Sequence, residues 1–276
     1  MSAATAQAQP GGNDPPPVLR RDEGAVAVLT LNRPASRNSL SRAMLAALRE
    51  ALAEIGGDEG IRCVVVAAEG PVFSAGHDLK ELAPRRADPD GGEAFFAETM
   101  ADCAAMMQAV VHLPQPVVAA VEGLATAAGL QLAASCDLVV AAEGARFCTP
   151  GVDIGLFCST PGVALARAVP RKAAMEMLLL GEMVPAAEAH RIGLVNRVVP
   201  AGQALPAALD LARRIASRSA VALRLGKRGV NAQLGQPLDR AYEAASRVMV
   251  ENMLAEDAAE GMGAFLAKRR PEWRHR

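Results

Sequence analysis

Two short stretches of this 276-residue sequence carry residue types that could do chemistry through the backbone. In the first, Glu122–Asp137 (EGLATAAGLQLAASCD), a strand is expected to end near Val121 and a helix to begin near Ala127 or Ala128. The first N–H groups of a helix are unpaired and carry a partial positive charge, so a negative oxygen is their natural ligand. A helix of small residues packed tightly on a neighbouring element would have the same sequence. This stretch alone does not distinguish that structural interpretation from an oxygen-binding site.

The second stretch, Phe73–Leu82 (FSAGHDLKEL), follows the mostly β-branched run Cys63–Ala67. Gly76 stands where a sharp turn after a strand requires an unusual backbone angle. Two such loops, each after a strand, could direct two N–H donors at one oxygen atom. That arrangement is an oxyanion hole, which stabilises the negative charge that develops on a carbonyl oxygen.

The elements that would hold these loops alternate between strand and helix. The runs Ala25–Leu31 and Ile61–Ala67 predict buried strands, and the apolar stripe over 40–55 predicts a helix between them, capped by Ser39 or Ser41. A strand–helix–strand unit with short breaks indicates an α/β fold. Further strands are expected over 116–121 and 138–142, a helix over 95–113, a mobile loop over 84–92, and later helices over 173–180, 186–192, 204–217, 220–232, 238–254 and 257–269.

Composition argues against several classes of function. The net charge is −1 and aromatic residues make up 3%, so neither a basic nucleic-acid surface nor a base-stacking platform is expected. The five cysteines are odd in number and lack metal-ligand spacing, which predicts reduced core residues and no metal site. No apolar run is expected to be long and uncharged enough to span a bilayer.

The first seventeen residues are rich in Pro, Gly and Ala and predict a disordered tail. A transit peptide would be richer in Arg, and no Arg precedes Arg20. A cytoplasmic location is therefore expected from composition.

Four motifs, in this order, resemble those of the crotonase, or enoyl-CoA hydratase/isomerase, superfamily. They are FSAGHD, EGLATAAGLQLAASCD about fifty residues later, PAAEAHRIGLVNRVVP (Pro185–Pro200) and EGMGAFLAKRRPEW (Glu260–Trp273). The resemblance implies a ββα spiral core over residues 18–203, a C-terminal helical trimerisation region over 204–276, and a homotrimer or hexamer. It also implies an acyl-CoA substrate, with coenzyme A as part of that substrate and no separate cofactor.

In this family two backbone N–H groups hold the thioester oxygen, and the resemblance places them on His77 and Ala128. Removing a proton beside a thioester, or adding water to its conjugated double bond, puts negative charge on that oxygen. Asp78 also fits a helix N-cap, and Lys80 also fits an ordinary surface lysine. The resemblance assigns contacts with the substrate or coenzyme A to Arg37, Ala75, Gly76, Asp78, Leu79, Lys80, Gly129, Phe265 and Lys268.

The sequence departs from the family where hydratases carry two glutamates that handle water and its proton. The matching positions hold Gln131 and Gly151, which cannot take up a proton at neutral pH. Loss of a general acid–base group typically lowers a rate about 10²–10⁴-fold, so weak hydration of crotonyl-CoA is expected. Gly151 would leave room for an external base. Cys158 is a candidate nucleophile or proton donor, which would be inert if buried without a nearby cation.

Other positions in these motifs also differ or have structural interpretations. Ala127 and Ala128 stand where family members usually carry glycine, so their methyl groups would narrow the pocket without removing the donor. Ser159 replaces the carboxylate of related dienoyl-CoA isomerases. Asp153 fits a cap or surface acid better than a base, and Glu122 is expected to point away from the oxyanion.

Two functions from different classes follow from this resemblance. The first is an enzyme that forms a thioester enolate during hydration, double-bond shift, decarboxylation or C–C cleavage. The second is a protein that binds acyl-CoA without turning it over, and thioester hydrolysis is a weaker third alternative. A panel of acyl-CoA substrates would separate them, because only an enzyme releases a new product.

Overall fold

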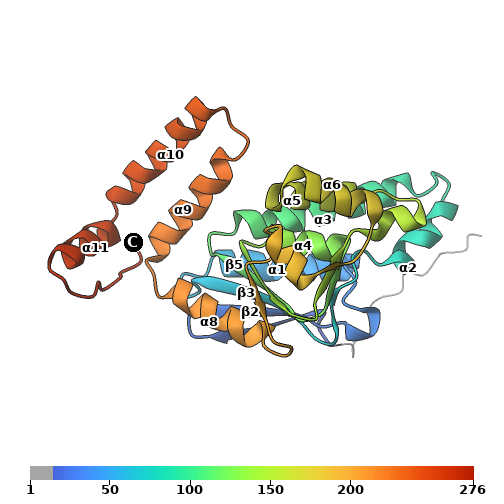
Figure 1. The fold of residues 1–276 in the computed structure, drawn as a ribbon, viewed down its shortest axis with the longest axis horizontal. Helices are drawn as coiled ribbons and strands as arrows, with labels where there is room; N and C mark the ends of the chain where they lie inside the picture. Colours follow the sequence, from blue (N-terminus) through green and yellow to red (C-terminus); the bar gives the residue numbers. More distant parts are fainter. Residues whose placement is uncertain (1–14) are drawn as a thin grey trace, which may run out of the picture.

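The computed structural model describes residues 15–276, which form two β-sheets and the helices around them (Figure 1). The larger sheet has the strand order β1-β2-β3-β5-β7-β10, and every neighbouring pair except β1 and β2 is parallel. The smaller sheet has the order β4-β6-β8-β9, in which only β9 is antiparallel to its neighbour. The strands are β1 (Val18–Glu23), β2 (Val26–Leu31), β3 (Cys63–Ala68), β4 (Val72–Ser74), β5 (Val117–Val121), β6 (Leu124–Thr126), β7 (Leu138–Ala142), β8 (Arg146–Cys148), β9 (Val184–Pro185) and β10 (Arg197–Val199).

The helices confirm the α/β class and lie mostly where hydrophobic periodicity predicts them. The side chain of Ser41 caps the first helix by accepting a hydrogen bond from the Met44 N–H at 3.2 Å. Short 3-10 helices cover Pro34–Ser36 (η1), Ala83–Ala87 (η2) and Pro150–Ile154 (η3). The α-helices are α1 (Arg42–Gly56), α2 (Leu79–Leu82), α3 (Glu93–His112), α4 (Ala128–Ser135), α5 (Ser159–Ala168), α6 (Arg171–Leu180), α7 (Ala186–Arg191), α8 (Ala204–Ala216), α9 (Ala220–Gln233), α10 (Leu238–Met253) and α11 (Glu256–Leu266).

The central strands are apolar on both faces because each face is covered by helices. In β2, Ala27 and Leu29 belong to the main core, which also contains residues of α1, α3 and α4. The alternate residues Val26 and Val28 face the other way and pack with Ala212 and other residues of α8. Alternation of side chains across a strand therefore divides one continuous hydrophobic run between two cores.

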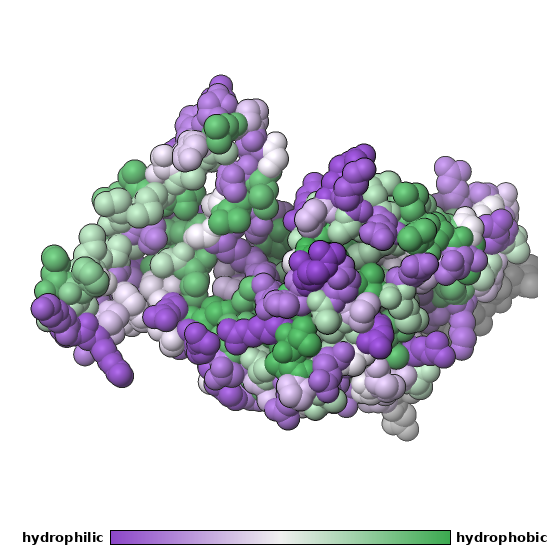
Figure 2. Space-filling view, viewed as in Figure 1, coloured by the Kyte–Doolittle hydropathy of each residue, from purple (hydrophilic) through white to green (hydrophobic). Residues whose placement is uncertain are grey.

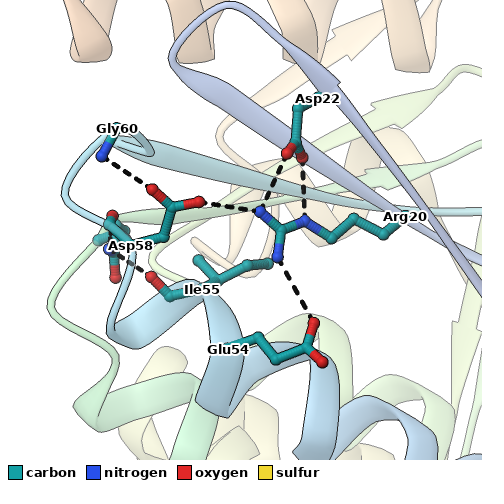
Figure 3. Close-up of polar contacts among 7 residues, drawn as sticks. Arg20, Asp22, Glu54, Ile55, Asp58 and Gly60 are labelled. Atoms are coloured by element: carbon teal, nitrogen blue, oxygen red, sulfur yellow. Dashed lines mark hydrogen bonds and ion pairs between the residues drawn. The ribbon is translucent and has the colours of Figure 1, made fainter.

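The edge strand β1 is tied to the turn between α1 and β3 by a charged network (Figure 3). The Arg20 guanidinium contacts Asp22 at 2.9 Å, Asp58 at 3.2 Å and Glu54 at 3.6 Å. Asp58 in turn accepts a hydrogen bond from the Gly60 N–H at 2.9 Å. The hydrogen bond with Asp22 is the main reason that the pKa of Arg20 is raised, and burial partly opposes it.

Helices α9, α10 and α11 extend away from the sheets as a C-terminal arm (Figure 1). The Lys227 ammonium on α9 fixes the base of this arm by donating to Asp137 Oδ2 at 2.7 Å, the Gln115 carbonyl at 3.1 Å and the Val110 carbonyl at 3.2 Å. Asp137 also accepts from the Val117 N–H at 2.7 Å. The division into a core over 18–203 and a helical region over 204–276 stays a prediction.

Two expectations about loops and tails need correction. Residues 1–14 of the expected disordered tail lie outside the described part of the chain, whereas Pro16 and Pro17 accept hydrogen bonds from Asn32 at 3.1 and 2.8 Å. The expected loop over 84–92 begins as η2, and Asp90 accepts hydrogen bonds from the N–H groups of Gly92 and Ala94. Local polar contacts therefore structure residues 16–17 and the segment 84–92.

One helix among residues 15–276, α3, is long and apolar enough to cross a membrane when judged by length and composition alone. The expectation that no such run exists is therefore wrong on this criterion. One side of α3 is nevertheless buried in the protein, and the helix packs on α1. This side of α3 contributes Cys103, Met106, Met107 and Val110 to the main core, and Thr99 is also buried.

Candidate functional site

The two loops singled out in the sequence lie side by side because the strands before them are neighbours. Strands β4 and β6 are parallel, with Ser74 opposite Ala125. A Cβ atom on Gly129 would lie 2.2 Å from the Ser74 carbonyl oxygen, and one on Gly123 would lie 1.9 Å from the Pro71 carbonyl oxygen. Only glycine permits such close approach of two backbones. The start of α4 is therefore packed directly on the chain that leads to Gly76.

Gly76 brings the turn after β4 against the first residue of α4. Its φ of +82° is in the region that favours glycine, and a Cβ atom there would lie 2.9 Å from Ala127 Cβ and 3.1 Å from Ala128 N. The turn is fixed by hydrogen bonds from the Leu40 N–H to the Gly76 carbonyl at 2.7 Å and from the Ala75 N–H to the Arg37 carbonyl at 3.0 Å.

Both backbone donors proposed from the sequence are available for a ligand. Ala128 is the first residue of α4, where an N–H has no partner within the helix. The His77 N–H has no hydrogen-bond acceptor within residues 15–276. Glu122 is turned elsewhere, as expected, because its carboxylate accepts from the N–H groups of Gly202 and Ala204 at the start of α8.

Ala127, which precedes the second donor, has strained backbone angles. Its φ of 50° and ψ of −120° lie in a region that an alanine rarely occupies. Conformations of this kind cost about 1–3 kcal/mol and persist where the surrounding structure imposes them. The contact with Gly76 and the hydrogen bond from the Ala127 N–H to the Cys148 carbonyl at 3.0 Å impose it here.

Three polar side chains, those of His77, Thr126 and Gln131, lie on the segments that carry the two donors. Gln131 Oε1 is buried without a hydrogen-bond partner within residues 15–276. Burial lowers the pKa of His77, and a hydrogen bond with the Leu40 backbone partly opposes this change. Thr126 was not singled out from the sequence, although it is the one hydroxyl in a run of small apolar residues.

The positions assigned to coenzyme A fall into two groups. Near the turn, Asp78 Oδ1 accepts from the Lys80 N–H at 2.9 Å and so caps α2 as expected, while the side chains of Arg37, Leu79 and Lys80 are exposed. Phe265 is 83% exposed on α11, and Lys268 follows this helix. Both lie in the C-terminal arm, so a single chain does not bring them to the first group (Figure 1).

Comparison with known proteins identifies the family to which this geometry belongs. The family model described as enoyl-CoA hydratase/isomerase matches residues 21–276. This chain belongs to the enoyl-CoA hydratase/isomerase family. Its fold is accordingly the crotonase fold of solved enoyl-CoA hydratases.

Two relatives and two solved structures show the extent of the similarity. Enoyl-CoA hydratase domain-containing protein 3, mitochondrial, from Rattus norvegicus is 46% identical over 97% of this chain and 88% of its own length. The protein of the same name from Homo sapiens is 45% identical over 95% of this chain and 85% of its own length. An enoyl-CoA hydratase from Mycobacterium smegmatis has a TM-score of 0.89 at 48% identity, over 94% of this chain and 99% of the other. The human domain-containing protein 3 has a TM-score of 0.88 at 46% identity, over 93% of this chain and 100% of the other.

These names contradict the expected cytoplasmic location. The rat, mouse and human relatives are all called mitochondrial. The Arg-poor composition of the first seventeen residues was therefore a poor guide to location.

Gly151, which the resemblance matches to the second glutamate of hydratases, has close neighbours. A Cβ atom on Gly151 would lie 2.8 Å from the Leu156 carbonyl oxygen and 2.9 Å from Cys158 Sγ. The thiol occupies the space where a side chain at position 151 would begin, and room for an external base stays a prediction. Burial raises the pKa of the Cys158 thiol, and a hydrogen bond with the Gly151 backbone partly opposes this. Asp153 is exposed, in agreement with a surface role.

Proposed function

We propose that this chain binds an acyl-CoA thioester and stabilises its enolate with the backbone N–H groups of His77 and Ala128. The supporting observation is the packing of Gly76 against Ala127 and Ala128, which places the two donor-bearing segments in contact. Both N–H groups are free of partners inside the described chain, so each can donate to a thioester oxygen. One preorganised donor of this kind contributes about 3 kcal/mol of transition-state stabilisation.

Hydration of a plain enoyl thioester is expected to be slow in this protein. Gln131 and Gly151 stand where related hydratases carry the glutamates that move protons to and from water. Neither residue exchanges a proton at neutral pH, and the buried Cys158 thiol has a raised pKa. The enolate-forming reactions that need fewer protein acid–base groups are a double-bond shift, decarboxylation and C–C cleavage. Thioester hydrolysis is a weaker alternative, in which the same donors would stabilise the oxyanion of a tetrahedral intermediate.

A second candidate is an acyl-CoA-binding protein without turnover. The observation that favours it is that, within residues 15–276, no charged side chain is among the buried polar groups beside the two donors. Binding requires only the donors and the coenzyme A contacts, whereas turnover other than decarboxylation requires a proton acceptor.

A panel of acyl-CoA thioesters analysed by mass spectrometry tests both candidates. Turnover of any member, abolished by Gly76→Ala, supports the enzyme, because a Cβ at this position collides with Ala127 and lies 3.1 Å from the Ala128 nitrogen. Gly24→Ala is the matched control, since Gly24 also has a positive φ but no neighbour within 4 Å of an added Cβ. If Gly76→Ala remains folded and fully active, the oxyanion assignment is wrong. Binding without product from any thioester would leave the second candidate.

We further infer that the C-terminal arm joins copies of this chain into a homotrimer or hexamer. None of the residues of α10 is buried, although the helix carries large apolar side chains along its length. Hydrophobic residues are visible along α10 in Figure 2. Exposed apolar residues of α10 and α11 include Tyr242, Met249, Val250, Met253, Phe265 and Leu266. A large exposed apolar surface marks an interaction site, and light scattering that gives a monomer mass at micromolar concentration would refute this assembly.

A further inference from the structure

The side chain of Asn38 joins separate stretches of main chain near the candidate site. Its Oδ1 accepts a hydrogen bond from the Arg33 N–H at 2.8 Å, and its Nδ2 donates to the Glu69 carbonyl at 2.9 Å and to the Val72 carbonyl at 2.8 Å. The residue is wholly buried, and both N–H groups of its amide are used. Arg33 precedes η1, whereas Glu69 follows β3 and Val72 begins β4. Asn38 therefore fixes η1 against the start of β4.

The backbone at Asn38 has a conformation that needs this support. Arg37 and Asn38 have φ angles of 54° and 50°, in the left-handed region that residues other than glycine rarely adopt. Such conformations persist where the surrounding structure imposes them. Two left-handed residues in succession turn segment 37–40 so that the Arg37 carbonyl and the Leu40 N–H both face the turn after β4.

Segment 37–40 contacts the turn that carries the His77 donor. The Ala75 N–H donates to the Arg37 carbonyl at 3.0 Å, and the Leu40 N–H donates to the Gly76 carbonyl at 2.7 Å. Leu40 and His77 also form an isolated parallel β-bridge. These contacts hold the turn through its main chain.

The bond from Leu40 determines where the His77 N–H points. The Gly76 carbonyl and the His77 N–H belong to one peptide group, which is planar and trans, so the two bonds point in opposite directions. With the Leu40 N–H bonded to the carbonyl oxygen at one end of this group, the N–H at the other end is directed away from segment 37–40. Hydrogen bonds in such a chain polarise one another, so the His77 N–H also becomes a stronger donor.

Ser39 adds a contact on the other side of His77. Its hydroxyl donates to Asp78 Oδ2 at 3.2 Å, while Asp78 Oδ1 accepts from the Lys80 N–H at 2.9 Å. The residues before and after His77 are thus both held by segment 37–40. The Ala128 donor is held in another way, by its place in the first turn of α4.

We propose that Asn38 is a positioning residue of the oxyanion hole, which holds segment 37–40 so that Leu40 directs the His77 N–H at the thioester oxygen. Ser39 has the same role to a smaller extent, through Asp78. This inference rests on the proposed function, because it requires a thioester oxygen at the His77 and Ala128 donors. Asn38 acts only through main-chain groups, without a contact to the substrate.

Isothermal titration calorimetry with butanoyl-CoA and S-butyl-CoA, a thioether that lacks the carbonyl oxygen, tests the inference. The ratio of their Kd values reports the donors, because the coenzyme A contacts are common to both ligands. In the wild type each donor should raise the ratio in favour of butanoyl-CoA about threefold to tenfold, the range of one net hydrogen bond. Asn38→Gly accepts the positive φ but removes all three side-chain hydrogen bonds, so it should lower the ratio about threefold to tenfold. Ser39→Ala should lower the ratio by a smaller factor.

Difference infrared spectroscopy of butanoyl-CoA, isotope-labelled at the thioester carbonyl, gives a spectroscopic readout of the same contact. Hydrogen bonds to the oxygen lower the stretching frequency of the carbonyl. Binding to the wild type should therefore lower this frequency, and Asn38→Gly should return it toward the value of the free ligand.

Gln115→Met is the matched control. Gln115 is 8% exposed and its amide donates to the Ile55 carbonyl at 2.8 Å, at the far end of α1 from segment 37–40. This variant should also lose stability in thermal melts, but it should keep the wild-type ratio and carbonyl frequency.

The outcomes separate this inference from the proposed function. A folded Asn38→Gly variant with the wild-type ratio and frequency would overturn the inference while the proposed function stands, and so would an equal fall of the ratio in Gln115→Met. If Asn38→Gly does not fold, an unchanged ratio and frequency in Ser39→Ala would overturn it. A wild-type ratio of one, or failure of butanoyl-CoA to bind, would overturn the proposed function and this inference with it.

Discussion

Replacement of Lys227 by methionine should detach the C-terminal arm from the sheet more than any change of a surface charge. The Lys227 side chain is 8% exposed and holds three oxygens, whereas its partner Asp137 is 30% exposed. Methionine keeps the apolar stem but leaves the Asp137 carboxylate with the Val117 N–H as its remaining partner in this cluster.

The expected loss can be estimated from this geometry. Breaking a buried ion pair by removing one partner typically lowers the free energy of unfolding by about 3–5 kcal/mol. Because Asp137 is partly exposed, water can solvate the carboxylate that loses its partner, so the free energy of unfolding should fall by about 2–3 kcal/mol. For a chain of this size the melting temperature should fall by about 4–12 °C.

Thermal denaturation at fixed protein concentration measures this effect, because assembly makes the melting temperature depend on concentration. Arg228→Met is the control: the next residue on α9 pairs with Glu251, and the two side chains are 54% and 53% exposed. That exposed pair should contribute less than about 1 kcal/mol. If both variants lower the melting temperature equally, the reasoning about the buried ammonium is refuted.

Three further variants test local geometry and charge. Ala127→Gly should leave stability unchanged or raise it by about 1 kcal/mol, because glycine relieves the positive φ at the cost of backbone entropy; a lower melting temperature would contradict this. Gly129→Ala should destabilise the fold or prevent it, since an added Cβ would lie 2.2 Å from a backbone oxygen, whereas Gly144→Ala, with nothing within 4 Å, should be neutral in circular dichroism melts. The hydrogen bonds with Arg269 lower the pKa of Glu260 to about 2. The contribution of the Glu260 carboxylate to stability is therefore complete above its ordinary pKa of 4.5 and is lost as the pH falls toward 2. The difference in melting temperature between wild type and Glu260→Gln should therefore be constant from pH 5 to 8 and shrink below pH 4.5; a difference that grows on acidification would disprove the linkage.

Periodicity predicted the large elements because they are long enough to show it. The alternating burial of β2 and the apolar stripe of α1 each extend over complete repeats of their own structure. The smaller sheet was not predicted, since β4, β6, β8 and β9 have two or three residues each and no repeat can be recognised in them. That sheet is nevertheless what brings the two loops together.

The candidate site was predictable where a residue acts through its backbone and a neighbouring glycine marks the turn. Gly76 has the unusual angle expected of it, and α4 begins at Ala128. The contact between Gly151 and Cys158 could not be predicted, because it depends on how the chain between these two positions folds back.

The close approach of Gly129 to the Ser74 carbonyl has a consequence for how this protein can change over evolutionary time. The segments that carry the two amide donors are held together by contact between main chains at Gly129 and Ser74. Mutations of the surrounding side chains can therefore change the reaction while the pair of backbone N–H donors is kept. The reaction then depends on side-chain atoms, and the scaffold depends on main-chain atoms.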